Sequence, residues 1–141
     1  MRDYKDLYKE AKGQRTRIYC DMDGVLADFM AAAKKATGMT FTQSDSDKHW
    51  AVIRKTRNFW SDMPWMPGGR QLWSYIRKYD THILSAYSTK DSNCVPGKMK
   101  WLRKNLNLTQ RSRIHLVRRS QKQDFAMTNN KPNVLIDDHA K

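Results

Sequence analysis

Short apolar runs recur along this chain, and each ends where polar or turn-forming residues begin. Residues 16–21 (TRIYCD) are rich in β-branched and aromatic types and lead into the turn-forming DMDG, which predicts a strand and then a turn. Three later runs end in the same way: 81–86 (THILSA), 113–117 (RIHLV) and 133–136 (NVLI). We therefore predict four strands.

Between these runs, apolar residues recur at helical spacing. Over 25–37 they fall on one arc, with Lys34 and Lys35 away from it and Gly38 as a stop signal. Further helices are expected over 70–79, over 96–106 and, briefly, over 122–127. Strands that alternate with helices imply an α/β fold with a parallel sheet and right-handed crossovers.

One segment interrupts this alternation. Residues 39–67 combine a polar SDSDK, a basic and aromatic HWAVIRKTRNFW and a proline-containing PWMP, so we interpret them as a compact, partly helical cap insertion. A chain of 141 residues fits one domain. The expected organisation is a single domain over 1–141, with its core at 16–38 and 68–141 and its cap at 39–67.

Acidic and hydroxyl side chains stand at the ends of three predicted strands. Asp21 and Asp23 follow the first strand, Ser85 ends the second, and Asp137 with Asp138 follows the last. Ligands of parallel sheets lie beyond the carboxyl ends of the strands, so these residues should converge on one edge. Clustered carboxylates repel one another unless a cation neutralises them, and hard oxygen ligands suit Mg²⁺.

The predicted edge suggests phosphoryl-transfer chemistry. A carboxylate such as Asp21 can attack phosphorus, and Asp23, two residues on, can act as the general acid and base. The Ser85 hydroxyl and the Lys122 ammonium could bind the phosphoryl oxygens. Each motif alone is weak, because DxDG, a terminal serine and an acidic pair are common turn features. Their order along the chain is the stronger signal.

The charge of the chain points to an anionic partner. Lysine and arginine total 27 against 14 acidic residues, for a net charge of +13, which attracts nucleotides or nucleic acid but also serves solubility alone. No apolar run reaches the length of about 18 residues that a membrane span needs, and the charged N-terminus is unlike a signal peptide. We expect a cytoplasmic protein without a membrane partner. Cys20 and Cys94 are too few for a disulfide framework.

With these motifs in order, the chain resembles the haloacid dehalogenase superfamily of phosphatases. DMDGVLAD (21–28) is similar to its first motif, ILS (83–85) to its second and VLIDD (134–138) to its fourth. The resemblance implies a three-layer Rossmann-like sheet. It also implies the roles of four side chains: Asp21 as nucleophile, Asp23 as acid and base, Ser85 as phosphate ligand, and Asp137 as the main late Mg²⁺ ligand. The resemblance also implies that Asp138 lies beside Asp137 at the metal and that the main-chain carbonyl of Asp23 is a further Mg²⁺ ligand.

The third motif of that superfamily is only a basic residue. Lys122, shortly before the last strand, is our choice. Lys131 is a rival, and Lys98 is less favoured because it precedes the third strand. A surface lysine without any role is the simplest alternative for each of them.

Within the superfamily, the insertion resembles the cap of the 5′(3′)-deoxyribonucleotidase-like branch. The segment NFWSDMPWMPGG (58–69) carries that resemblance. Phe59, Trp60 and Trp65 could stack on a nucleobase or sugar. They could equally form a small core of the cap.

These observations lead to three functional hypotheses. The first is a Mg²⁺-dependent phosphomonoester hydrolase that forms an aspartyl-phosphate and acts on a small phosphorylated substrate, a (deoxy)nucleoside monophosphate. The second is a phosphatase of the 3′ or 5′ ends of DNA or RNA, which the net charge of +13 favours. The third is an inactive nucleic-acid-binding or scaffold protein. Relatives usually continue past the acidic pair with another helix and strand, whereas this chain ends at Lys141, which favours the third hypothesis.

Overall fold

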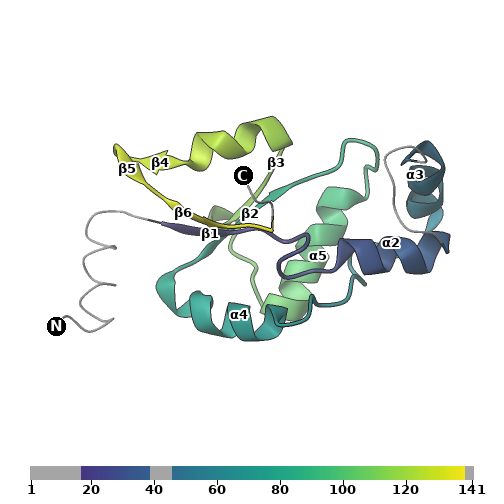
Figure 1. Cartoon of the computed structure of the whole chain (residues 1–141), viewed down its shortest axis with the longest axis horizontal. Helices are drawn as coiled ribbons and strands as arrows, with labels where there is room; N and C mark the ends of the chain where they lie inside the picture. The colour runs from purple at the N-terminus through teal and green to yellow at the C-terminus, as the bar shows by residue number, and fades with distance from the viewer. Residues whose placement is uncertain (1–16, 39–45, 139–141) are drawn as a thin grey trace.

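The computed structural model describes residues 17–38 and 46–138, and a four-stranded parallel sheet forms its centre (Figure 1). The strand order is β3-β2-β1-β6. The strands are β1 (Ile18–Cys20), β2 (His82–Ala86), β3 (Ile114–Val117) and β6 (Val134–Ile136). All four predicted strands form, and the prediction of an α/β fold with a mostly parallel sheet is confirmed.

The helices lie on both sides of this sheet. Figure 1 shows α4 and α5 on one side and the 3₁₀ segment η4 on the other. The α-helices are α2 (Phe29–Thr37), α3 (Ser46–Lys55), α4 (Gly69–Ile76) and α5 (Cys94–Leu106). The 3₁₀ segments are η2 (Arg77–Tyr79), η3 (Arg111–Arg113) and η4 (Arg119–Phe125). Helices on both faces explain why β2 is buried along almost its whole length.

The register of the sheet places the ends of two strands at the same level. Cys20 of β1 pairs with Ile83 of β2 and with Ile136 of β6. The amide of Asp21 then donates to the Ile136 carbonyl at 3.0 Å. Residues that directly follow β1 and β6 are therefore neighbours, although more than a hundred positions separate them in the sequence.

The first predicted helix begins later than its apolar spacing indicates. The prediction starts it at residue 25, but α2 begins at Phe29, so its first turn is wrong. The Met22 carbonyl accepts the amides of residues 25–27 at 3.1, 2.9 and 2.9 Å, which closes a tight turn in place of a helix. Asp28 then caps α2 by accepting the Ala31 amide at 3.0 Å.

The region after β3 also differs from the prediction. The brief helix expected over 122–127 is the 3₁₀ segment η4, and a hairpin of β4 (Met127–Thr128) and β5 (Lys131–Pro132) follows it. Asn129 and Asn130 form its turn with positive φ angles of 50° and 64°. Asparagine tolerates this left-handed conformation, so the NN pair in a polar stretch was the missed signal.

Most of the predicted cap packs on the same hydrophobic core as the sheet. Its residues 39–45 lie outside the described part of the chain. Ile53, Phe59, Trp60 and Met63 are buried in one cluster with residues of β1, β2 and α5. The Trp101 indole of α5 donates to the Met63 carbonyl at 2.7 Å, which ties the insertion to the core. None of the described helices has the length and hydrophobicity of a membrane span.

Candidate phosphoryl-transfer site

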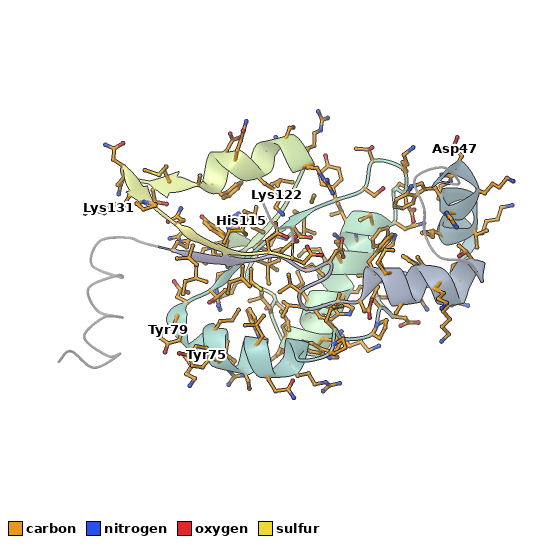
Figure 2. The ribbon with its side chains drawn as sticks, in the orientation of Figure 1. Asp47, Tyr75, Tyr79, His115, Lys122 and Lys131 are labelled. Carbon is orange, nitrogen blue, oxygen red and sulfur yellow. The ribbon has the colours of Figure 1, made fainter. Side chains whose placement is uncertain are left out.

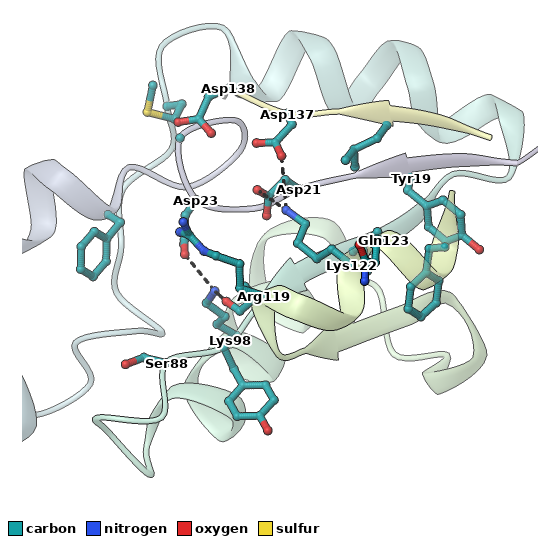
Figure 3. Close-up of a pocket in the computed structure, with 18 of the residues that line it drawn as sticks. Tyr19, Asp21, Asp23, Ser88, Lys98, Arg119, Lys122, Gln123, Asp137 and Asp138 are labelled. Atoms are coloured by element: carbon teal, nitrogen blue, oxygen red, sulfur yellow. Dashed lines mark hydrogen bonds and ion pairs between the residues drawn. The ribbon is translucent and has the colours of Figure 1, made fainter. Parts of the chain in front are cut away.

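A cavity of about 1130 Å³ opens at the carboxyl ends of β1, β2 and β6. All four acidic residues that the sequence places at this edge line it: Asp21, Asp23, Asp137 and Asp138. Figure 3 shows them around the turn that follows β1. The predicted convergence of the two ends of the chain is therefore present in the fold.

Three of these carboxylates are close enough to share one ion. Asp21, Asp137 and Asp138 each offer an oxygen atom, and these atoms lie within 4.8 Å of one another. Gly24 lets Asp138 approach, since any side chain at this position, where φ is +80°, would collide with the Asp138 carboxylate. Three carboxylates form a donor set that fits a hard divalent cation such as Mg²⁺.

Lys122 of η4 reaches two of the three carboxylates. Its Nζ atom donates to Asp21 Oδ2 at 3.1 Å and to Asp137 Oδ2 at 3.3 Å. Burial raises the pKa of Asp21, and the Lys122 charge only partly opposes this effect. Burial lowers the pKa of Lys122, but attraction by Asp21 and then by Asp137 outweighs it, so the net pKa is raised.

The rival lysines have very different positions. Lys131 is exposed on the β5 hairpin, far from the point where Lys122 enters the site (Figure 2). Lys98 of α5, which the sequence made the less favoured rival, is completely buried beside the acidic residues. The structure thus brings two lysines to the site, one from η4 and one from α5.

Lys98 makes three hydrogen bonds that hold the site together. Its Nζ atom donates to Asp23 Oδ2 at 2.9 Å, Ser85 Oγ at 3.0 Å and the Ala86 carbonyl at 2.8 Å. The signal was present in the sequence, because Lys98 shares the buried face of α5 with Trp101 and Leu102. A lysine among apolar residues at helical spacing needs buried acceptors, so this pattern could have marked Lys98 as buried, although not which acceptors it meets.

Ser85 does not reach the cavity, and Asp23 uses only one of its oxygens in hydrogen bonds with described residues. Ser85 is completely buried and does not line the cavity, so Lys98 lies between its hydroxyl and Asp23. Its role as a phosphate ligand stays a prediction. Asp23 Oδ1 is buried and has no hydrogen-bond partner among the described residues. A buried oxygen without a partner is costly, so this atom is available to form a hydrogen bond with a ligand.

Aromatic rings form the wall of the cavity on the side of α2 and α3. Of the three aromatic residues predicted to contact substrate, Trp60 lines the cavity, whereas Phe59 and Trp65 do not. Trp65 packs on Trp101, with ring centroids 5.0 Å apart. Phe29 and Trp50, which the sequence did not single out, stack on Trp60 at 5.5 and 6.2 Å and also line the cavity.

Comparison with known proteins adds no functional assignment. No protein-family model matches the chain, and no curated protein gives a significant match. What the site can do therefore has to be inferred from the positions and charges of its own side chains.

Proposed function

We propose that this chain is a Mg²⁺-dependent phosphomonoester hydrolase of the haloacid dehalogenase type, with Asp21 as its nucleophile. The observation that carries the proposal is the meeting of Asp21, Asp137 and Asp138 within 4.8 Å at one edge of a parallel sheet. Lys98 and Lys122 supply positive charge at the same place. Adjacent parallel strands bring these turns together, but they do not require an acidic side chain at each position.

Both carboxylate oxygens of Asp21 accept hydrogen bonds that hold the side chain in position. Oδ1 accepts the Met22 amide at 2.7 Å and Oδ2 accepts Lys122 at 3.1 Å. In the first step, an Asp21 oxygen bonds to phosphorus, the bond from phosphorus to the leaving oxygen breaks, and Asp23 gives that oxygen its proton. In the second step, Asp23 takes a proton from water, which attacks phosphorus and releases Asp21 and inorganic phosphate.

The other side chains would hold the metal ion, balance the charge of the phosphoryl group or position Asp23. Asp21, Asp137 and Asp138 would hold Mg²⁺, together with the Asp23 carbonyl that the family resemblance implies. When bound, the ion offsets the repulsion between these carboxylates and the phosphate. Lys122 balances charge on the phosphoryl oxygens, and Lys98 keeps Asp23 in place through Oδ2 while leaving Oδ1 to exchange the proton.

The cavity supports a nucleotide as the small substrate. Its volume of about 1130 Å³ accommodates more than a phosphate group. Phe29 and Trp50 are partly exposed and offer aromatic surface on the side where the rest of the substrate would lie, with the buried Trp60 ring packed behind them. Aromatic rings stack on any nucleobase, so (deoxy)nucleoside monophosphates are the class we propose.

Phosphate release from a panel of phosphomonoesters that includes dTMP and dUMP tests this proposal. We expect turnover that requires Mg²⁺ and falls by about three orders of magnitude in Asp21→Asn, because the nucleophile is lost. Asp62→Asn, an exposed aspartate that does not line this cavity, is the matched control and should leave turnover unchanged. A beryllofluoride adduct on Asp21 would exclude the inactive scaffold. Full activity of Asp21→Asn would refute the mechanism.

A further inference from the structure

A second cavity of about 280 Å³ lies next to the proposed site. Trp60 lines both cavities, so this residue lies between them. The segment that follows β2 also runs along both, since residues 88–90 line the first cavity and Asp91 and Asn93 line the second. Figure 3 shows Ser88 at the edge of the site far from Asp137, which is where this segment leaves it.

Four exposed cations surround the second cavity: Arg54, Lys55, Arg57 and Lys100. Arg54 and Lys55 come from the last turn of α3, where they also suit the helix dipole. Arg57 and Lys100 have no such explanation, because they lie in the following loop and in α5. Within residues 17–38 and 46–138, none of the four forms an ion pair with a carboxylate.

The acidic residue of this cavity, Asp91, is buried and already has partners for both of its oxygens. Asp91 is only 3% exposed. Its Oδ2 atom accepts the Trp60 indole at 2.8 Å, and its Oδ1 atom accepts the Asn93 amide at 3.0 Å. The carboxylate therefore fixes Trp60 between the cavities, and among the described residues it does not pair with any of the four cations.

The two cavities are joined along their rims. Arg54 Nη1 donates to the carbonyl of Lys90 at 3.2 Å, and Lys90 lines the first cavity. A ligand that leaves the first cavity past Lys90 therefore meets Arg54 and the second cavity next. Cationic side chains along this path favour a ligand with several negative charges in a row.

We infer that the second cavity binds backbone phosphates of a single-stranded nucleic acid whose terminal phosphate occupies the proposed site. This inference rests on the proposed function, because the terminal phosphate is the one that Asp21 attacks. A mononucleotide has a single phosphate and leaves the cationic cavity unused. A single strand supplies further phosphates, and its end can place a base against the aromatic wall.

Binding in a background that cannot turn over tests the inference apart from catalysis. In Asp21→Asn protein, the affinity for a fluorescent ten-nucleotide single strand with a terminal phosphate is measured by anisotropy at several salt concentrations. The double substitution Arg57→Ser, Lys100→Ser should weaken binding about 20-fold at 0.1 M salt and lower the salt slope by about 1.4. The matched control is Arg77→Ser, Lys78→Ser, two exposed cations of η2 that line neither cavity.

Turnover in the otherwise unchanged protein separates the inference from the proposed function. The cavity substitutions should raise KM for the phosphorylated strand and leave kcat/KM for a mononucleotide unchanged. Equal weakening by the cavity and control substitutions would overturn the inference, even if phosphatase activity is found. Competition by poly-glutamate that is as strong as competition by the strand would assign the surface to acidic proteins.

Discussion

The sheet carries two partly buried polar clusters, one built from ion pairs and the other from a pair of histidines. The charged cluster lies at the carboxyl end of the strands and comprises Asp21, Asp23, Lys98, Lys122 and Asp137. The histidine pair, His82 and His115, lies on β2 and β3 below η4. His82 Nδ1 and His115 Nε2 are 3.0 Å apart, and the two rings stack with their centroids 5.3 Å apart.

Burial disfavours the charged form in both clusters, but in the histidine pair no carboxylate outweighs it. It lowers the pKa of His82 to about 4 and also lowers that of His115, with Arg17 adding to both shifts. Tyr19 packs edge-on against both rings, so the pair sits in an aromatic setting. The histidines therefore share a neutral hydrogen bond, which costs little in such surroundings.

In the charged cluster, each buried or partly buried lysine has acceptors that compensate its charge. Lys98 has three acceptors and Lys122 has two carboxylates, so their charges are compensated directly. Buried ion pairs seldom add stability over apolar packing. The comparison shows that the histidine pair is stable without charge, whereas the charged cluster depends on direct ion pairs and therefore suits the proposed phosphoryl transfer.

The largest effect should come from Lys98→Met, which breaks the charged cluster at its most buried point. Asp23, Ser85 and the Ala86 carbonyl would lose their donor, and the free energy of unfolding should fall by roughly 3 kcal/mol. Urea denaturation measures this loss. Lys100→Met, an exposed position of the same helix, should change stability by less than about 0.5 kcal/mol. Equal values for the two variants would show that Lys98 holds nothing in place.

A smaller change in stability should come from Mg²⁺, because the ion should stabilise the charged cluster and leave the histidine pair unaffected. At a concentration tenfold above its Kd, the ion should stabilise the protein by about 1.4 kcal/mol in thermal unfolding, and EDTA should reverse this. Lys122→Met should bind Mg²⁺ more tightly, because the lysine competes for Asp21 and Asp137. Asp62→Asn is again the control. Stabilisation that survives in Asp137→Asn with Asp138→Asn would place the ion elsewhere.

The smallest effect should be a pH dependence from the histidine pair. The folded pKa of His82 lies near 4, below its ordinary value of 6.5, so the unfolded chain binds protons more readily in this window. Stability should fall by about 1 kcal/mol as the pH drops from 7 to 5.5. The charged groups that act on His82 besides His115 are Arg17, Asp80 and Arg113.

His82→Phe isolates this contribution. The variant keeps an aromatic ring against Tyr19 but cannot bind a proton, so its unfolding free energy should change less over the same pH range. His139→Phe, outside the described residues, is a control for removing one histidine elsewhere. An unchanged pH profile in His82→Phe would mean that the pair does not titrate in this window.

Local chemistry explains which predictions from the sequence succeed. The four strands follow from β-branched and aromatic runs that end at turn residues, and these signals are complete within a few positions. The first helix was placed one turn too early because Val25 and Leu26 continue its apolar spacing, while the Met22 carbonyl that captures the amides of 25–27 acts through the three-dimensional turn. The hairpin at Asn129 and Asn130 was missed because its strands are only two residues long.

The sequence by itself determined that acidic residues follow the first and last strands, and a parallel sheet then requires them to share an edge. Only the tertiary structure decided which partners meet them there. Lys98 reaches Asp23 through the rotation of α5, and Phe29 and Trp50 face the cavity through the packing of α2 against α3. Where each strand begins and ends along the sequence depends on local patterns. Which way a side chain points into the site depends on how separate elements pack, and no short segment encodes this packing.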